Sequence, residues 1–386
     1  MVARTTVRRH GRPIGGVDLL LLAAVLALLV VGIDMVYSAS YVLAHNSPLY
    51  GSDTYFLERQ VLWAALGGVL QVLTARADYH FWQRVSLPML AGAIVLLVVV
   101  LVPGLGHEEY GAQRWLHLGP LPLIQPSEFA KLAVVLYFAD WLSRKGEQVR
   151  DLTYGSVPFA IILAVVVALV VVQPDMGTSF VMAASAVAVF FVAGAHLGHF
   201  AGGLAVGAVA LTVLIEESGY RLSRFSAFLD PQADPLGGGW HTIQTQIALG
   251  SGGIFGLGLG ESRQKFYWMP GAHTDAIFAV VGEELGFLGC LALILLFALL
   301  AYRGYQIALR APDQFGSLLA VGATSMLVFQ AAVNIGVVTS LLPFTGITLP
   351  FISSGGSSLL VSMVAVGWLL SVSRQAVAPG ASGRTR

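Results

Sequence analysis

The chain has 386 residues, of which 56% are apolar and 11% are charged, and its 21 basic residues balance its 21 acidic ones. About a quarter of a typical soluble domain is charged, so this composition excludes an ordinary soluble fold. The net charge is zero, and we expect no nucleic-acid partner. The only cysteine, Cys290, excludes an intramolecular disulfide and a cysteine-based metal site.

Ten apolar stretches approach the length of about 20 residues that crosses about 30 Å of bilayer hydrocarbon. They cover approximately residues 18–38, 60–75, 86–104, 125–142, 154–173, 176–193, 197–215, 276–302, 317–340 and 350–372. We therefore predict an all-α integral membrane protein with about ten transmembrane helices. The first stretch imitates a signal peptide, but we expect it to stay uncleaved because it is long and nine further spans follow.

Basic residues are distributed unequally between the two sides of these spans. Fourteen of the 21 lie on the side that includes both chain ends, six lie on the other side, and Lys131 lies inside a span. Since cytoplasmic connections carry the excess of Lys and Arg, both ends are predicted to be cytoplasmic. We divide the chain into a cytoplasmic tail over residues 1–17, a membrane domain over residues 18–373 and a second cytoplasmic tail over residues 374–386.

Three connections on the outer side stand out. Residues 105–124 and 216–275 form long loops, and the second, between spans 7 and 8, is too apolar to be disordered, so we expect it to be functional. Residues 341–358 carry two prolines and three glycines. This composition predicts a re-entrant or broken segment, which a membrane tolerates only against protein or a wet cavity.

A few charged side chains lie within predicted spans, where each costs at least about 2.5 kcal/mol on insertion scales. Glu128 and Lys131 are three residues apart and share one helix face, so they either neutralise each other and fix packing or line a substrate cavity. Glu283 and Glu284 are adjacent, and at least one of them must face protein or water. Asp175, in the turn QPDMG, is positioned to cap the helix that follows.

Asp275 is the strongest candidate for chemistry. It follows His273 and Thr274 where the long outer loop enters the eighth span, so it meets both the aqueous face and the membrane core. A carboxylate in this place is able to accept a proton from a sugar hydroxyl. The alternative is that Thr274 or Asp275 only caps the helix.

A glycine-rich run, GSGGIFGLGLG over residues 250–260, resembles a phosphate-binding loop. It lacks the Lys-Ser/Thr ending of a nucleotide P-loop and lies on the predicted outer side, which argues against a nucleotide. Two interpretations stay open. Its backbone amides bind a lipid-linked diphosphate, or its glycines allow close packing.

Five segments together resemble the SEDS family, named for shape, elongation, division and sporulation, and more its division branch than its elongation branch. They occur in the family's order over nearly the whole membrane domain: GAQRWL (111–116), QPSEFAKLA (125–133), QPDMGT (173–178), GLGLGESRQKFYWMPGAHTDAIFAVVGEELG (256–286) and LPFTGITLPFISSGGSS (342–358). Two positions depart from the family's pattern. Glu261 stands where Asn is frequent, and Ser354 stands where Tyr is frequent.

The resemblance implies a peptidoglycan glycosyltransferase in the bacterial cytoplasmic (inner) membrane. Such an enzyme polymerises lipid II, an undecaprenyl-diphosphate-linked disaccharide peptide, on the outer face, and is paired with a class B penicillin-binding protein. Asp275 matches the family's essential aspartate, which implies the catalytic base. Substrate contacts are implied for the matching motif residues and the loop cations, namely Arg114, Trp115, Glu128, Lys131, Arg263, Lys265 and Ser357.

The sequence leaves several points open. No cofactor is evident, although a divalent cation is a candidate for stabilising the leaving diphosphate, as are Arg114, Arg263 and Lys265. The competing function is a transporter that flips lipid II, which would use Glu128 and Lys131 but would need no outer base. The absence of an obvious inverted repeat argues mildly against transport. A scaffold that only recruits the transpeptidase would leave the outer charges without a chemical role.

Overall fold

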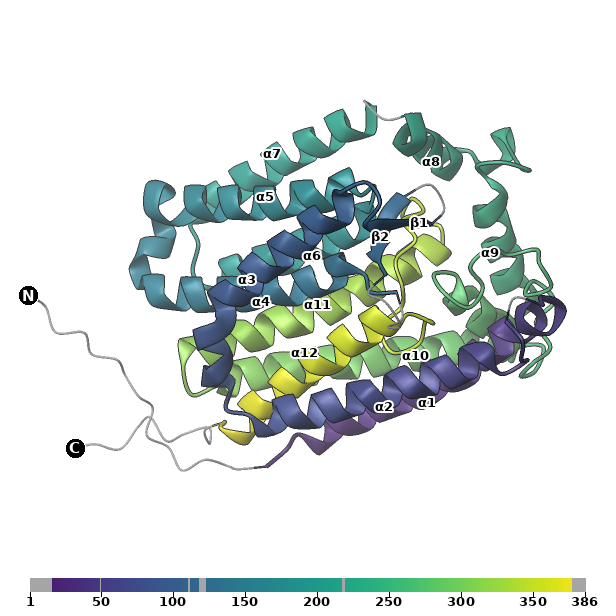
Figure 1. Cartoon of the computed structure of the whole chain (residues 1–386), viewed down its shortest axis with the longest axis horizontal. Helices are drawn as coiled ribbons and strands as arrows, with labels where there is room; N and C mark the ends of the chain where they lie inside the picture. Colours follow the sequence, from purple (N-terminus) through teal and green to yellow (C-terminus); the bar gives the residue numbers. More distant parts are fainter. Residues whose placement is uncertain (1–15, 49, 110–111, 118–122, 217–218, 377–386) are drawn as a thin grey trace, which may run out of the picture.

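Apolar runs separated by capping and turn residues fold into helices along most of the chain. The computed structural model describes residues 16–48, 50–109, 112–117, 123–216 and 219–376. Its elements are α1 (Leu19–Asn46), α2 (Tyr55–Arg76), α3 (Tyr79–Leu101), β1 (Gly106–Glu109), β2 (Ala112–Leu116), α4 (Pro126–Lys145), α5 (Val157–Val172), α6 (Met176–Val192), α7 (Leu197–Glu216), α8 (Gly219–Leu229), α9 (Trp240–Ser251), α10 (Ile277–Arg310), α11 (Gln314–Val338) and α12 (Gly356–Arg374), with short 3-10 or π turns at 146–150, 152–156 and 231–233 (Figure 1).

Within the described residues, six helices are long and apolar enough to cross a membrane: α1, α3, α5 with the turn before it, α10, α11 and α12. Each of the ten predicted stretches overlaps a helix. The all-α prediction is confirmed, and the described residues 106–109 and 112–116 add one short pair of antiparallel strands. The loop over residues 216–275 also contains helices α8 and α9.

Local chemistry accounts for several helix boundaries. The Asp18 carboxylate accepts a hydrogen bond from the backbone N–H of Leu21 and caps α1. The predicted cap at Asp175 is confirmed, since its Oδ1 accepts from the N–H of Thr178 at 3.1 Å. Pro126 occupies the first turn of α4, where its missing N–H costs nothing. Gly286 has φ 69°, and the kink that it makes in α10 requires a residue without a Cβ.

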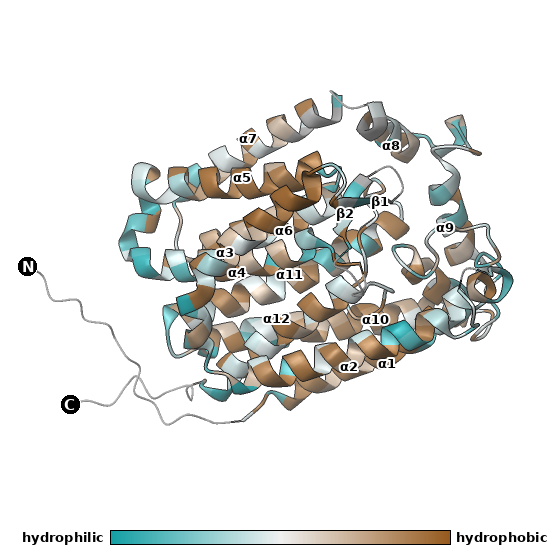
Figure 2. Ribbon diagram, in the orientation of Figure 1, coloured by the Kyte–Doolittle hydropathy of each residue, from teal (hydrophilic) through white to brown (hydrophobic). Residues whose placement is uncertain are grey.

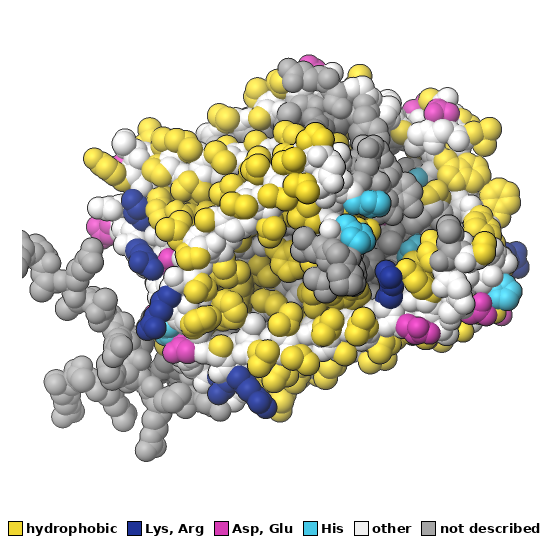
Figure 3. Space-filling view, in the orientation of Figure 1, with side chains coloured by type: hydrophobic (Ala, Val, Ile, Leu, Met, Phe, Trp, Pro, Cys, Tyr) yellow, Lys and Arg dark blue, Asp and Glu magenta, His cyan; other side chains and the backbone are white. Residues whose placement is uncertain are grey.

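The helices pack into one bundle with α11 and α12 inside it. Most of α11 and α12 is buried, whereas less than half of the apolar stretch is buried in each of α1, α3, α5 and α10, although these helices are strongly apolar. Figure 2 shows hydrophobic residues along the length of these helices. On the face in Figure 3, hydrophobic side chains cover the middle, and most charged ones lie toward the two ends. An apolar exterior of this kind suits a lipid environment, so the chain is an integral membrane protein.

The segment between α11 and α12, over residues 339–355, is irregular and yet deeply packed. Ile347, Leu349 and Phe351 are each at most 5% exposed. The segment lies so close to α1 that a Cβ on Gly32 would stand 2.2 Å from the backbone oxygen of Phe351. Irregular backbone packed against protein agrees with the broken segment predicted for residues 341–358.

Candidate functional site

Asp275 lies in the turn that leads into α10, and α11 fixes its backbone. The Asn334 side chain on α11 donates hydrogen bonds from Nδ2 to the carbonyl oxygens of Asp275 and Ile347, each at 2.8 Å. Asp275 as a whole residue is half-buried, and its carboxylate accepts a hydrogen bond from the Thr274 hydroxyl at 2.9 Å. It does not cap the helix, because the N-cap position of α10 is Ala276. The turn that carries the carboxylate is therefore held in place by α11.

The residues before Asp275 are held by the irregular segment between α11 and α12. The Ser353 hydroxyl donates to the carbonyl oxygen of Thr274 at 2.5 Å, and the backbone N–H of Ser354 donates to the carbonyl of His273 at 2.9 Å. The contact of Ser354 uses only its backbone, so the departure from the family's Tyr does not remove it. Two segments far apart in sequence thus share one hydrogen-bonded turn.

Burial controls the protonation of this turn. It raises the pKa of the Asp275 carboxyl above its ordinary value of 3.8, and the neighbouring His241 ring, the Thr274 hydroxyl and the Arg224 charge offset part of that effect. Burial lowers the pKa of His273 to about 4, so this ring is neutral at physiological pH. A carboxylate with a raised pKa is a better base than an ordinary aspartate.

Glu283 and Glu284 hold the loop that precedes Asp275. Glu283 accepts from the hydroxyl of Ser262 and the backbone N–H of Arg263. Glu284 accepts from Lys265 Nζ at 3.0 Å and from the hydroxyl of Ser38 on α1 at 2.6 Å. Both carboxylates are buried. Although adjacent helix positions point in different directions, the loop over residues 260–265 wraps around the helix and reaches both.

The glycine-rich run packs against the same helix. Gly256 has φ 81°, and a Cβ there would stand 2.1 Å from the carbonyl oxygen of Glu284. The backbone N–H groups of Leu257 and Gly258 donate to the carbonyls of Glu283 and Glu284. For this part of the run, close packing explains the glycines, since those amides already have protein partners.

Glu128 and Lys131 form an ion pair of 2.9 Å inside the bundle, with side chains only 4% and 0% exposed. Lys131 Nζ also donates to Gln330 Oε1 at 2.5 Å. The amide of Gln330 then reaches the carbonyl and hydroxyl of Thr348 and the hydroxyl of Ser358. The pair thus connects α4 to α11, to α12 and to the irregular segment that holds the Asp275 turn. One oxygen of Glu128 is buried and has no hydrogen-bond partner.

The remaining predicted site residues are distributed over other contacts. Arg114 on β2 donates to the carbonyls of Gln173 and Pro174 and so ties the hairpin to the turn between α5 and α6, while Trp115 beside it is half-buried. Ser357 is buried and accepts a hydrogen bond from the backbone N–H of Gln125. Arg263 exposes its side chain, whereas Lys265 is buried and paired with Glu284.

The contacts therefore form several groups rather than one cluster around Asp275. Among the described residues, no three His, Cys, Asp or Glu side chains lie together in a way that could hold a metal ion. A divalent cation that stabilises the leaving diphosphate therefore remains a prediction. Two residues that lie outside the five motifs, Arg224 and His241, lie close to the Asp275 turn, and both contact Phe344 of the last motif. Arg224 and His241 act electrostatically on the Asp275 carboxyl group, and this connection is visible only in the three-dimensional structure.

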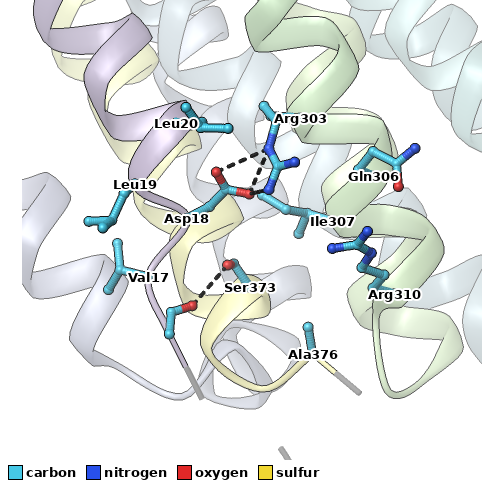
Figure 4. Close-up of a pocket in the computed structure, with 11 residues that line it drawn as sticks. Val17, Asp18, Leu19, Leu20, Arg303, Gln306, Ile307, Arg310, Ser373 and Ala376 are labelled. Atoms are coloured by element: carbon cyan, nitrogen blue, oxygen red, sulfur yellow. Dashed lines mark hydrogen bonds and ion pairs between the residues drawn. The ribbon is translucent and has the colours of Figure 1, made fainter. Parts of the chain in front are cut away.

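A separate cavity of about 300 Å³ lies at the start of α1, between α1, α10 and α12 (Figure 4). Arg303 of α10 binds the Asp18 carboxylate there through Nε at 3.0 Å and through its terminal nitrogen at 2.5 Å. Ser373 on α12 donates to the carbonyl of Gly16. This cavity lies at the N-terminal end of the membrane domain, and Asp275 is not among the residues that line it.

Sequence comparisons connect this arrangement with known proteins. The family model described as cell cycle protein, covering FtsW, RodA and SpoVE, matches residues 18–378. A probable peptidoglycan glycosyltransferase FtsW of Trichlorobacter lovleyi is 44% identical over 92% of this chain and 93% of its own length. The stage V sporulation protein E of Bacillus subtilis is 44% identical over 92% of this chain and 97% of its own.

Solved structures give the same result. A chain from a structure described as the structural coordination of polymerization and crosslinking by a peptidoglycan synthase complex is 31% identical, with a TM-score of 0.75 over 93% of this chain and 98% of its own. The rod shape determining protein RodA of Thermus thermophilus is 30% identical, with a TM-score of 0.68 over 94% of this chain and 99% of its own.

The bundle, the loop anchored on α10 and the aspartate at the end of that loop define a class of polytopic membrane proteins with a candidate site at one end of the helices. This chain belongs to the FtsW, RodA and SpoVE family. The predicted resemblance to the SEDS family is confirmed, and so is the prediction that the chain is more similar to the division branch than to the elongation branch. The FtsW relative shares 44% of its residues with the chain, and the RodA structure shares 30%.

Proposed function

We propose that this chain is a peptidoglycan glycosyltransferase that polymerises lipid II into glycan strands. The observation that carries the proposal is Asp275, a carboxylate whose pKa is raised by burial and whose backbone is fixed by Asn334. Relatives named as peptidoglycan glycosyltransferases cover nearly the whole chain, which supports the same activity. None of the relatives or structures described above is named as a transporter.

The chemistry is a single displacement at the anomeric carbon of the donor sugar. The Asp275 carboxylate takes the proton of the acceptor hydroxyl while that oxygen forms the new glycosidic bond. The bond to undecaprenyl diphosphate breaks, and its electron pair leaves with the diphosphate. A pKa raised toward the operating pH makes the carboxylate a stronger base, and the fixed turn keeps it within reach of the hydroxyl.

The leaving diphosphate needs positive charge, which the outer cations supply in our proposal. Arg263 is the best placed of the predicted group to meet a ligand, because its side chain is exposed while its backbone is anchored on Glu283. Arg114 and Trp115, both on the hairpin, also contact the lipid-linked substrate in our proposal. Lys265 and the pair Glu128–Lys131 are engaged with protein groups, so we assign them to positioning the loop and the irregular segment.

We propose ten spans, with both ends in the cytoplasm and Asp275 on the outer face. Helices α2, α4, α6 and α7 join the six that are long and apolar enough to cross a membrane. The unequal distribution of Lys and Arg supports this orientation. With this orientation, the membrane domain covers residues 18–373, and the residues before and after it are cytoplasmic tails. A class B penicillin-binding protein is the proposed partner, supported by the similarity to a chain of a peptidoglycan synthase complex.

The test is polymerisation of purified lipid II by the purified chain, alone and with its partner, with Asp275→Asn as the variant. Asp53→Asn is the matched control, because Asp53 is an exposed carboxylate that contacts only His45 among its described ion-pair partners. We expect the control to keep its activity and Asp275→Asn to lose at least about a hundredfold in rate. A folded Asp275→Asn protein that polymerises like wild type would refute the assignment.

The same preparation separates the enzyme from the flippase. Fluorescent lipid II in reconstituted liposomes reports translocation, and gel analysis reports polymer. Translocation that survives Asp275→Asn, with no polymer from wild type under any condition, would favour a transporter over an enzyme.

A further inference from the structure

The cavity at the start of α1 lies far from the candidate site and takes no part in the proposed chemistry (Figure 4). Asp275 comes just before the first residue of α10, whereas Arg303 and Arg310, which line the cavity, lie toward the end of that helix. Helix α1 begins at the cavity, and α10 and α12 end there. With the proposed orientation, this end of the bundle lies in the cytoplasmic leaflet of the membrane.

Two arginines border the cavity from one face of α10. Arg303, Ile307 and Arg310 follow the helical repeat and all line it. Figure 4 shows the Arg310 side chain extending from α10 toward the other lining residues. Among these lining residues, Asp18 is the only one with a carboxylate. The lining therefore carries more positive than negative charge.

Both arginines keep hydrogen-bond donors for a ligand. Arg303 binds the Asp18 carboxylate through Nε and one terminal nitrogen, and its other terminal nitrogen makes no hydrogen bond to a described residue. Arg310 is exposed and makes no hydrogen bond or ion pair within the described part of the chain. A guanidinium group presents its donors in a planar fork that matches phosphate oxygens. The cavity is thus suited to a phosphate group.

Exposed apolar side chains border the same cavity. Leu19 and Leu20 line it and are 73% and 56% exposed. Tyr302, beside Arg303 in the sequence, is also exposed, and tyrosine is enriched at the level of the lipid headgroups. A free phosphate ion would leave both leucines uncovered, whereas a phospholipid brings acyl chains that cover them. The surroundings therefore favour a phospholipid.

The two tails of the chain carry the wrong charge to fill the cavity. Residues 1–15 contain four arginines and residues 377–386 contain two, and neither segment contains Asp or Glu. The excess positive charge of the lining would repel such segments. An anion from outside the chain is the better complement, and the cytoplasmic leaflet is rich in anionic lipids.

We propose that this cavity binds the headgroup of an anionic phospholipid of the cytoplasmic leaflet. Arg310 and the second terminal nitrogen of Arg303 hold the phosphate, and the acyl chains lie along Leu19 and Leu20. Basic pockets between transmembrane helices on the cytoplasmic side bind lipid headgroups in this way.

Native mass spectrometry of the purified full chain in detergent tests the proposal by counting bound lipids during a titration. The probe is phosphatidylglycerol, which has a net negative charge, and the comparison lipid is phosphatidylcholine with the same acyl chains, which has none. We expect the first phosphatidylglycerol to bind at least about tenfold more tightly than phosphatidylcholine. Inorganic phosphate at the same concentration should not displace it.

Two substitutions in the lining should change this affinity in opposite directions. Arg310→Gln removes a cation and should weaken phosphatidylglycerol binding about fivefold. Asp18→Asn keeps an oxygen that caps α1 and releases Arg303 from its ion pair, so it should tighten binding about fivefold. The matched controls are Arg76→Gln and Glu147→Gln, which change the net charge equally at exposed positions on the same predicted side, outside the cavity. Each control should stay within about twofold of wild type.

Two results would overturn the site. One is equal binding of the two phospholipids, and the other is a loss in Arg310→Gln no larger than in Arg76→Gln, since the attraction would then come from the charge of this whole side. Displacement of phosphatidylglycerol by inorganic phosphate would overturn the lipid as the occupant. Thermal unfolding without added lipid verifies that each variant is folded. The assay contains no lipid II, so its result is independent of the proposed glycosyltransferase activity.

Discussion

Lys131→Met offers a sharp test of the charged pair inside the bundle. Methionine has nearly the same length and no charge, so the substitution removes the ammonium that lies 2.9 Å from Glu128 and leaves the packing intact. It also removes the donor to Gln330, whose amide connects to the irregular segment that holds the Asp275 turn. The variant therefore tests whether the pair serves packing or substrate.

The structure sets the expected magnitude. Both side chains are almost completely inaccessible, so Glu128 would remain as a buried carboxylate without a cation, and its second oxygen already has no partner. Breaking a buried pair on one side costs about 3–5 kcal/mol. Replacing both members by apolar residues of similar volume, in Glu128→Leu with Lys131→Met, is often neutral in comparable cases. The single variant should melt several degrees lower than wild type, and the double variant should recover most of that loss.

The assay is thermal unfolding in detergent, followed on the same samples by lipid II polymerisation. If the pair only fixes packing, the double variant regains activity together with stability. A double variant that is as stable as wild type and still inactive would refute the packing interpretation and support a cavity that binds substrate. A single variant as stable as wild type would refute the energetic argument itself.

Three further predictions concern Asp275, the glycine loop and the start of α1. Protonated Asp275 contributes to the free energy of unfolding because its pKa is raised in the folded chain. This contribution is complete at pH values below the ordinary pKa of 3.8, and it is lost as the pH rises through the raised pKa. Asp275→Asn should therefore melt higher than wild type at neutral pH, with no such excess below 3.8, while wild-type turnover falls as the pH drops through the raised value. Gly256→Ala should destabilise the chain more than Gly253→Ala, by thermal unfolding, because both positions have positive φ, with a left-handed cost of about 1–2 kcal/mol, but only Gly256 meets backbone. Asp18→Ala should lower the melting temperature more than Asp18→Asn, by the equivalent of about 1 kcal/mol, because Asn keeps the cap while both lose the charge that binds Arg303.

Much of the fold could be predicted from local signals. Spans leave long apolar runs in a sequence, and each predicted range overlaps a helix. The cap at Asp175 depends on residues three apart, so its pattern was visible. Asp275 stood out because it ends the loop at the start of an apolar run. In each case the physical cause lies within a few residues of the effect.

The rest depends on contacts between distant residues. Lys265 was expected to meet substrate, and its pairing with Glu284 is visible only when the loop is seen wrapped around α10. His241 lies outside every motif, and its ring contact with Phe344, 103 positions away, is visible only in three dimensions. The strands of the hairpin are short and polar, and their pairing, which puts His107 opposite Trp115, has no strong alternation to announce it.

The contact between Ser38 and Glu284 has a consequence for how the chain is made. The two residues are separated by 246 positions, and at a synthesis rate of about 5–20 residues per second the ribosome needs roughly 12–50 seconds to add the second after the first. During that interval the part of α1 around Ser38 lacks its partner on α10. This contact of the first helix is therefore set late, and a chain interrupted before residue 284 leaves α1 and the loop over residues 260–265 without the Glu284 side chain that joins them.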